Sequence, residues 1–139
     1  MLFRSVEVED IPRDLKLPIG TMAGWNAIFQ NILMNSVNAM IDSDSRRIRC
    51  SGGSSDGEGY LLVEDTGVGV DIESSGELFK PFVRRAQITE ERRALGLGGV
   101  GLGLTIVRMI AASLHCEVGF VKPSPPFSTA LELRWEIRQ

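Results

Sequence analysis

Three asparagines on one expected helix are the first residues whose type and spacing suggest chemistry. Asn31, Asn35 and Asn38 follow each other at spacings of four and three, within a helix expected over 22–41. At about 100° per residue they share one face of that helix. Asparagine is a poor helix former, and solvent-facing helix sides usually carry Glu, Lys and Gln. Amide oxygens bind hard cations such as Mg²⁺ and amide NH₂ groups donate to phosphate, so the face predicts a site for such ligands; a plain solvated face is the alternative.

A carboxylate followed by two glycines forms a second candidate. Asp65, Gly67 and Gly69 come directly after an apolar run, 60–63, that is expected to be a strand. A buried carboxylate can accept a hydrogen bond from the exocyclic amine of adenine, whereas guanine presents a carbonyl there. Glycines let the backbone approach a ring closely. A tight turn with a capping aspartate explains the same residues, so both interpretations remain open at this point.

A cluster of glycines precedes a second expected helix, over about 102–114. Without side chains, backbone N–H groups can converge on an anion, and a helix N-terminus adds a favourable dipole. The cluster therefore predicts a phosphate cradle, with a flexible hinge as the alternative. A G-x-G-x-x-G match is present, but the charged segment 89–95 before it is not a strand, which argues against a dinucleotide-binding fold; a P-loop motif is absent. The clustered residues are Gly96, Gly98, Gly99, Gly101 and Gly103.

A charged segment, 84–93, lies between an apolar block and the glycine cluster. Charge runs usually form solvated loops. The position nevertheless suits a mobile lid whose arginines, Arg84 and Arg85, can reach phosphates.

The elements that must position these groups alternate between strands and helices. Period-two patterns predict strands near 1–11 and over 129–137, and short apolar runs predict strands at 48–50, 60–63 and 117–121. The Gly/Ser-rich stretch 51–59 is expected to be a hairpin connection. With no internal repeat or linker, the pattern predicts one α+β domain over 1–139, a sheet with helices on one face. A chain of 139 residues is long enough to bury a core.

Composition excludes several classes of function. A net charge of −3 and a pI near 5.2 argue against general nucleic-acid binding or direct contact with an anionic membrane. The sequence contains no run long enough for a membrane span and opens with no signal peptide. Two cysteines and one histidine are too few for a disulfide framework or a multi-histidine metal site, so free thiols and a cytoplasmic location are expected, whether or not a parent protein is membrane-anchored.

Taken together and in this order, the motifs resemble the ATP-binding catalytic domain of bacterial two-component sensor histidine kinases. That family belongs to the superfamily of gyrase, Hsp90 and MutL ATPases, which share the Bergerat α/β sandwich. The N box is similar to 31–38, the first glycine box to 65–69, the phenylalanine box to 78–82 and the second glycine box to 99–107. The resemblance covers nearly the whole chain and implies a mixed, mostly antiparallel sheet with helices packed on one face.

The resemblance also implies ligands and roles for single residues. ATP and Mg²⁺ are the expected cofactors, with Asn35 binding the metal through its side-chain oxygen. Asn31 and Asn38 would face the phosphates or the waters of the ion, and Asp65 would read adenine. The lid would span about 83–98. The remaining nucleotide-binding residues implied are Gly67, Gly69, Val70, Arg84, Arg85, Gly99, Val100, Gly101, Leu102, Gly103 and Thr129.

Asn31 bears on the expected reaction. Hydrolysing relatives carry a glutamate at this position as general base, and an amide cannot take a proton from water near neutral pH. The resemblance therefore implies a protein-histidine kinase domain that transfers the γ-phosphate to a histidine on a separate dimerisation domain, absent from this chain, for relay to a response regulator. No residue is assigned as catalytic with certainty; Asn31 is the candidate. The alternatives are a superfamily ATPase, an anti-sigma-type serine kinase and a degenerate, non-catalytic binding module.

The sequence departs from the family pattern at four points. Ser36 replaces an alanine, Ala39 stands where many members have an aromatic residue that stacks on adenine, and Ser128 replaces the glycine before Thr129. His115 and Cys116 occupy the place of His-Gly-Gly, and His115 is expected to be a helix-end residue rather than a phosphoacceptor. The first two departures keep the degenerate module open.

Overall fold

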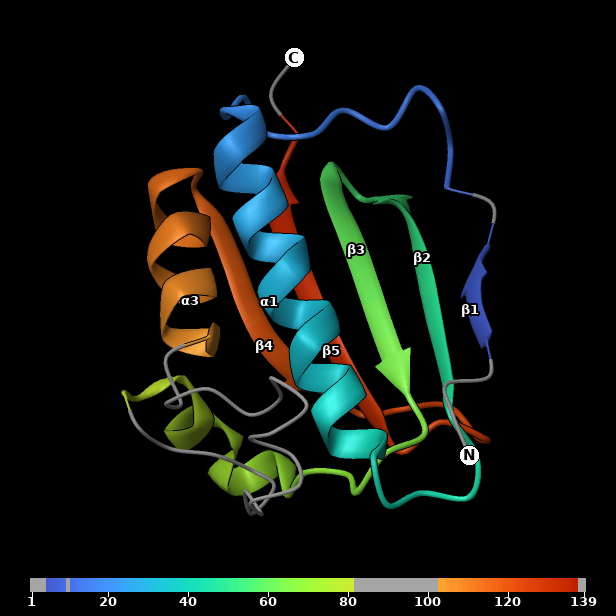
Figure 1. Cartoon of the computed structure of the whole chain (residues 1–139). Coiled ribbons are helices and arrows are strands. Elements are labelled where there is room, and N and C mark those ends of the chain that lie inside the picture. The colour runs from blue at the N-terminus through green and yellow to red at the C-terminus, as the bar shows by residue number, and fades with distance from the viewer. Residues whose placement is uncertain (1–4, 10, 82–102, 138–139) are drawn as a thin grey trace.

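The computed structural model describes residues 5–9, 11–81 and 103–137, and within these it contains one sheet, two α-helices and a 3-10 helix (Figure 1). In chain order the elements are β1 (Ser5–Val8), α1 (Met22–Met40), β2 (Arg47–Ser55), β3 (Glu58–Asp65), η1 (Ile72–Phe79), α3 (Gly103–Ser113), β4 (Cys116–Val121) and β5 (Thr129–Glu136).

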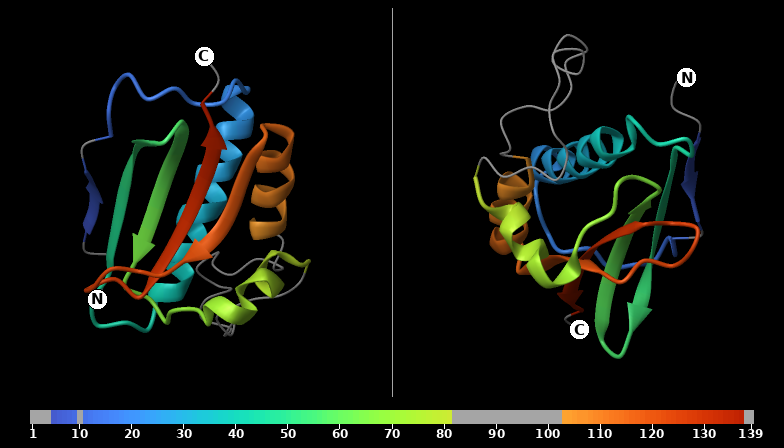
Figure 2. Two further views of the ribbon diagram at one scale, coloured as in Figure 1. Left: turned by 180° about the vertical axis from the view of Figure 1, so that it is seen from behind. Right: turned by 90° about the horizontal axis from the view of Figure 1, so that it is seen from below.

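The sheet is mixed and mostly antiparallel. Its strand order is β1-β2-β3-β5-β4, in which only the β1–β2 pair is parallel. Helices α1 and α3 lie side by side against one face of the sheet (Figures 1 and 2). The α+β sandwich expected from the sequence is thereby confirmed. No helix in the described part of the chain is long and apolar enough to cross a membrane.

The core fills the space between the two helices and the sheet. Along β3, alternate residues face the helices, and their partners on β5 do the same. On α1 the buried positions recur at helical spacing, because residues four apart share a face. The helix is capped at its N-terminus by Thr21, whose Oγ1 accepts a hydrogen bond from Gly24 N at 3.0 Å. The central core residues include Ile28, Ile32, Met40, Ile48, Leu61, Val63, Val107, Ala111, Leu131, Leu133 and Trp135.

The expectation of a loop over 51–59 is wrong for most of that stretch. Residues 51–55 continue β2, β3 begins at Glu58, and the turn itself is Asp56-Gly57, with φ of 54° and 79°. The glycines in these strands serve packing instead: the indole of Trp135 occupies the space that a Cβ on Gly59 would need. The Gly-rich composition therefore led to a wrong prediction of a loop. At Gly59, the absence of a side chain makes room for the large Trp135 side chain on β5.

Both cysteines are free thiols. Burial raises the pKa of the Cys116 thiol to about 11. Cys116 begins β4, directly after His115, which has a left-handed backbone with φ of 59° and whose N–H donates to Ala112 O at 3.1 Å. His115 thus terminates α3, as the sequence predicts.

Candidate functional site

Two buried polar side chains face each other where β3 ends and β5 begins. Asp65 and Thr129 are cross-strand partners, and each is only 1% exposed. Gly67 N donates to Asp65 Oδ1 at 2.9 Å, which fixes the orientation of the carboxylate. The structure therefore brings together three of the residues predicted to bind the nucleotide.

Unmet hydrogen-bonding capacity is concentrated near this end of the sheet. Among the described residues, the buried side-chain atoms without a hydrogen-bond partner are Thr129 Oγ1 and Asn38 Oδ1. Leaving a buried polar atom unsatisfied costs about 1–3 kcal/mol. Such atoms in a native fold call for a partner beyond the described residues, such as a water molecule or a ligand. Both atoms belong to residues of the predicted site.

The turn after Asp65 contacts the C-terminal end of α1. Val68 N donates to Ala39 O at 3.1 Å, and a Cβ on Gly67 would lie 2.7 Å from the same oxygen. A glycine is therefore needed at position 67, because α1 approaches the backbone closely there. A glycine is favoured at position 69 because its φ of 80° is one that other residues rarely adopt. Ala39 is buried against the turn, so this position offers no open side chain to a base.

Thr66 ties the same turn to β2. Its Oγ1 accepts from Arg47 N at 3.0 Å and donates to Ser45 O at 2.7 Å. Its own N–H donates to Arg47 O at 3.2 Å. The sequence analysis assigned no role to Thr66. A hydroxyl residue directly after a strand-end aspartate is the pattern that could have revealed it, since such side chains often hydrogen-bond nearby backbone groups.

The first asparagine of the N box lies beside the start of α3. Asn31 Oδ1 is 3.2 Å from the point where a Cβ of Gly103 would stand, and Asn31 Nδ2 donates to Ala27 O at 2.7 Å. From Asn31 to Ala39, α1 rises about 12 Å, with half-buried Asn35 between them. One helix thus connects the N-terminus of α3 with the turn that carries Asp65.

One of the other predicted site residues lies in the described part of the chain, and the rest lie outside it. Val70 is partly buried and packs against the core. No group of three His, Cys, Asp or Glu side chains that could hold a metal occurs within residues 5–9, 11–81 and 103–137. The lid 83–98 and the site residues Arg84, Arg85, Gly99, Val100, Gly101 and Leu102 lie outside the described residues.

The phenylalanine box contacts both α3 and the sheet. Phe79 is buried, with its ring centroid 5.7 Å from that of Phe120. Its carbonyl accepts a hydrogen bond from Thr105 Oγ1 at 2.9 Å. Arg108 lies with its guanidinium carbon 5.4 Å from the Phe79 ring centroid. These contacts anchor Phe79 to the first turns of α3.

A second buried carboxylate, Glu64, points to the opposite face of the sheet. Arg49 donates to its Oε1 through Nη2 at 2.6 Å and Nε at 3.0 Å, and Ser124 N donates to Oε2 at 3.4 Å. The Arg49 guanidinium lies 4.4 Å from the ring centroid of Phe127. Hydrogen bonding to Glu64 raises the pKa of Arg49, so the guanidinium stays charged. This cluster fixes the β4–β5 loop to the sheet.

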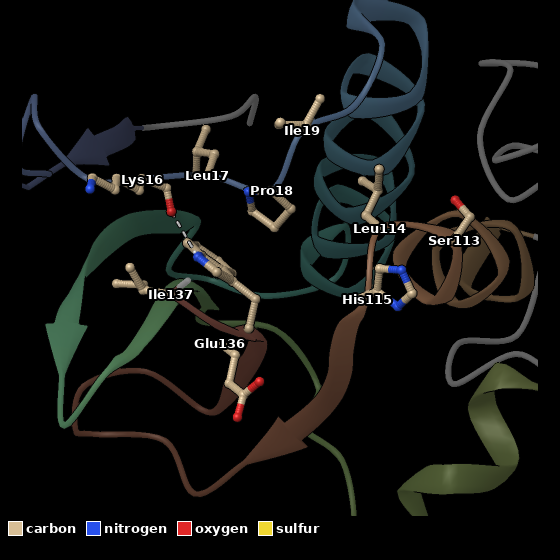
Figure 3. Close-up of a pocket in the computed structure, with 10 residues that line it drawn as sticks. Lys16, Leu17, Pro18, Ile19, Ser113, Leu114, His115, Glu136 and Ile137 are labelled. Carbon is tan, nitrogen blue, oxygen red and sulfur yellow. Dashed lines mark hydrogen bonds between the residues drawn. The ribbon is translucent and has the colours of Figure 1, made fainter. Parts of the chain in front are cut away.

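A cavity of about 700 Å³ lies at the other end of β5 from Thr129 (Figure 3). Trp135 Nε1 donates to Lys16 O at 2.8 Å there and attaches the segment before α1 to the sheet. None of the predicted site residues lines this cavity. Its lining is Lys16, Leu17, Pro18, Ile19, Ser113, Leu114, His115, Trp135, Glu136 and Ile137.

The chain belongs to the family described as "Histidine kinase-, DNA gyrase B-, and HSP90-like ATPase", whose model matches residues 23–137. This finding confirms the resemblance and defines the class of protein to which the chain belongs. Among curated proteins, the chain is similar to sensor histidine kinase YkoH of Bacillus subtilis, with 34% identity over 95 residues, 68% of this chain and 20% of that protein. It is also 36% identical to the phosphate regulon sensor protein PhoR of Pseudomonas aeruginosa over 92 residues, 66% of this chain and 19% of that protein. The chain spans a fifth or less of the length of these relatives.

Solved structures share the fold. The mycobacterial sensor histidine kinase MprB superposes with a TM-score of 0.72 at 21% identity, covering 96% of this chain and 83% of that one. The ATP binding domain of PrrB from Mycobacterium tuberculosis gives a TM-score of 0.66 at 21% identity, covering 96% and 80%. The fold of the chain is therefore that of histidine kinase catalytic domains.

Proposed function

We propose that this chain is the ATP-binding catalytic domain of a sensor histidine kinase. It holds ATP with Mg²⁺ and delivers the γ-phosphate to a histidine on a separate dimerisation domain, for relay to a response regulator. The names of its relatives support this assignment. The observation that carries it is the pairing of Asp65 with Thr129, whose buried Oγ1 lacks a partner among the described residues.

The base-binding role follows from hydrogen-bond chemistry. A carboxylate only accepts, so Asp65 selects a purine that donates an amine, as adenine does. The Thr129 hydroxyl can both donate and accept, and therefore can complete the hydrogen bonding of a ring nitrogen or a bridging water. Gly67 and Gly69 bring the backbone close to the ring.

The phosphate-binding role is assigned to the asparagines of α1 and to the start of α3. Asn31, Asn38 and the start of α3 at Gly103 would face the triphosphate, and Asn35 would supply an oxygen to Mg²⁺, whose charge would offset that of the phosphates. Mg²⁺ commonly keeps several waters and takes few protein ligands in addition to phosphates, so one amide oxygen is a sufficient contribution. The second glycine box and the lid arginines, Arg84 and Arg85, complete this proposal.

Asn31 favours transfer over hydrolysis. Its amide is not basic, and its Nδ2 is engaged with Ala27 O. The chain therefore supplies no general base for water at this position, and catalysis depends on positioning and charge stabilisation. The nucleophile is a histidine of the partner domain.

Calorimetry with a non-hydrolysable ATP analogue tests the binding step. The wild-type chain should bind, and Mg²⁺ should strengthen binding. In Asn35→Ala the gain from Mg²⁺ should shrink while metal-free binding persists; Asn26→Ala, an exposed asparagine on the same helix, is the matched control. An absence of binding heat from the wild type would favour a non-catalytic module.

Phosphotransfer tests the reaction. Mixed with ATP and a histidine-bearing dimerisation domain, the chain should produce an acid-labile phosphoprotein. An acid-stable product would indicate a serine kinase. Steady ATP turnover by this chain alone, abolished in Asn31→Ala, would instead establish an ATPase.

A further inference from the structure

The residue before Thr129 makes contacts that the glycine expected there cannot make. Ser128 Oγ donates to Gly67 O at 2.7 Å and lies 3.3 Å from Asp65 O. Its backbone N–H also donates to Asp65 O, at 2.9 Å. The backbone bond would survive any substitution except proline, so the hydroxyl specifically adds the link to the Gly67 carbonyl.

We propose that Ser128 is a positioning residue for base recognition: its hydroxyl holds the turn after β3 so that the Asp65 carboxylate is oriented before nucleotide binds. This inference rests on the proposed function, in which Asp65 reads adenine. Ser128 acts through the turn, and its role is separate from that of the neighbouring Thr129.

Ser128 holds the peptide that follows Gly67, which is adjacent to the peptide whose N–H bonds Asp65. Glycine has the widest backbone freedom, and Gly67 provides the N–H that fixes Asp65 Oδ1. The peptide that follows Gly67 is planar, so its two ends move together. Its carbonyl accepts from Ser128 Oγ and its N–H, on Val68, donates to Ala39 O. One bond comes from β5 and the other from α1, and together they fix the plane of this peptide.

The support behind Ser128 is itself anchored. Phe127 is buried beneath the guanidinium groups of Arg47 and Arg49, which lie 5.2 and 4.4 Å from its ring centroid. On the same loop, Ser124 N donates to the buried Glu64. A hydroxyl on a loop fixed at two points can restrain the turn instead of moving with it.

Nucleotide selectivity separates positioning from general structure. Ser128→Ala should weaken ATP binding roughly three- to tenfold, the size expected for one lost hydrogen bond. The loss should be clearly smaller for purine riboside triphosphate, which lacks the adenine amine. Ser128→Thr, which restores a hydroxyl, should bind ATP within about twofold of wild type. Ser124→Ala is the matched control on the same loop and should change neither affinity. Equal losses for both nucleotides, or unchanged ATP binding in Ser128→Ala, would overturn the inference.

Amide hydrogen exchange tests the restraint without nucleotide. The Gly67 N–H should exchange roughly three- to tenfold faster in Ser128→Ala than in wild type, and at the wild-type rate in Ser124→Ala. Unchanged exchange at Gly67 in a folded Ser128→Ala would refute the restraint. If the wild type itself fails to bind ATP, the proposed function fails, while the exchange rates still decide whether Ser128 holds the turn.

Discussion

Glu64 and Asp65 are consecutive carboxylates, each 1% exposed, on opposite faces of the same strand. On the outer face, Glu64 is held by Arg49 and by Ser124 N. On the helix face, Asp65 pairs across the sheet with Thr129, whose hydroxyl has no partner among the described residues. The two carboxylates are equally buried, but their surroundings differ.

We interpret this difference as one between a polar group with a structural role and a polar group with the proposed binding role. Burying a charge is tolerated when an opposite charge and hydrogen bonds compensate for the loss of water, as they do around Glu64. Beside Asp65, the Thr129 hydroxyl has no hydrogen-bond partner among the described residues, which supports the proposed binding role of this pair. The degree of burial is therefore a poor guide to function. Whether the neighbouring polar atoms have hydrogen-bond partners is more informative.

The largest expected effect comes from breaking the outer cluster. Arg49→Met leaves Glu64 buried without its cation and should lower the free energy of unfolding by about 3 kcal/mol, measured by urea denaturation. ATP affinity of the folded fraction should stay within about twofold of wild type. Arg134→Met removes an exposed pair with Glu58 and Glu132 and should leave stability unchanged. A large loss of ATP affinity in Arg49→Met would erase the contrast between the two faces.

The reciprocal change acts on the helix face. Asp65→Asn keeps the shape but replaces an acceptor-only group with an amide, and should weaken ATP binding by about 1.5–3 kcal/mol in calorimetry. GTP binding should not weaken in parallel, because guanine presents a carbonyl where adenine has its amine. If Asp65→Asn binds ATP like wild type, the base-recognition role is wrong.

Close packing of the turn is tested by adding one methyl group. A Cβ on Gly67 would meet Ala39 O at 2.7 Å, so Gly67→Ala should cost about 1–3 kcal/mol of stability. Gly76→Ala is the control, since nothing lies within 4 Å of its Cβ position. Thermal unfolding of both variants gives the comparison; equal melting temperatures would show that α1 and the turn can separate without penalty.

The smallest effect is expected from Thr129→Val, which should raise stability and lower ATP affinity. Thr129→Val removes a buried hydroxyl that lacks a partner among the described residues, so stability should rise by about 1 kcal/mol. ATP affinity should fall roughly three- to tenfold, because the nucleotide can no longer form a hydrogen bond with this hydroxyl. A variant that is both less stable and equally good at binding would assign Thr129 to the fold alone.

Local patterns in the sequence were sufficient to propose the candidate site, because its motifs lie in short segments. The asparagine spacing on α1 and the Asp65-Gly67-Gly69 run each depend on neighbouring residues, so the sequence could place them. The role of Glu64 could not be predicted, since it depends on a loop near Ser124, distant in sequence. The restraint by Ser128 was visible only as a departure from glycine.

The strands around Gly59 show a different limit. Glycine and serine favour turns, and this preference led to the prediction of a loop over 51–59. In the structure the space vacated by Gly59 is filled by Trp135 from β5, a contact that no local pattern reports. Tertiary packing overrode the local preference there.

The cross-strand pairing of Asp65 with Thr129 constrains which insertions and deletions this chain can tolerate. Side chains alternate between faces along a strand, so removing one residue inside β3 while the rest of the register is kept would turn Glu64 inward and Asp65 outward. The hairpin at Asp56-Gly57, at the far end of the same strand, can change length without that exchange. Length variation among natural homologues should therefore gather at the hairpin and avoid the interior of the strand.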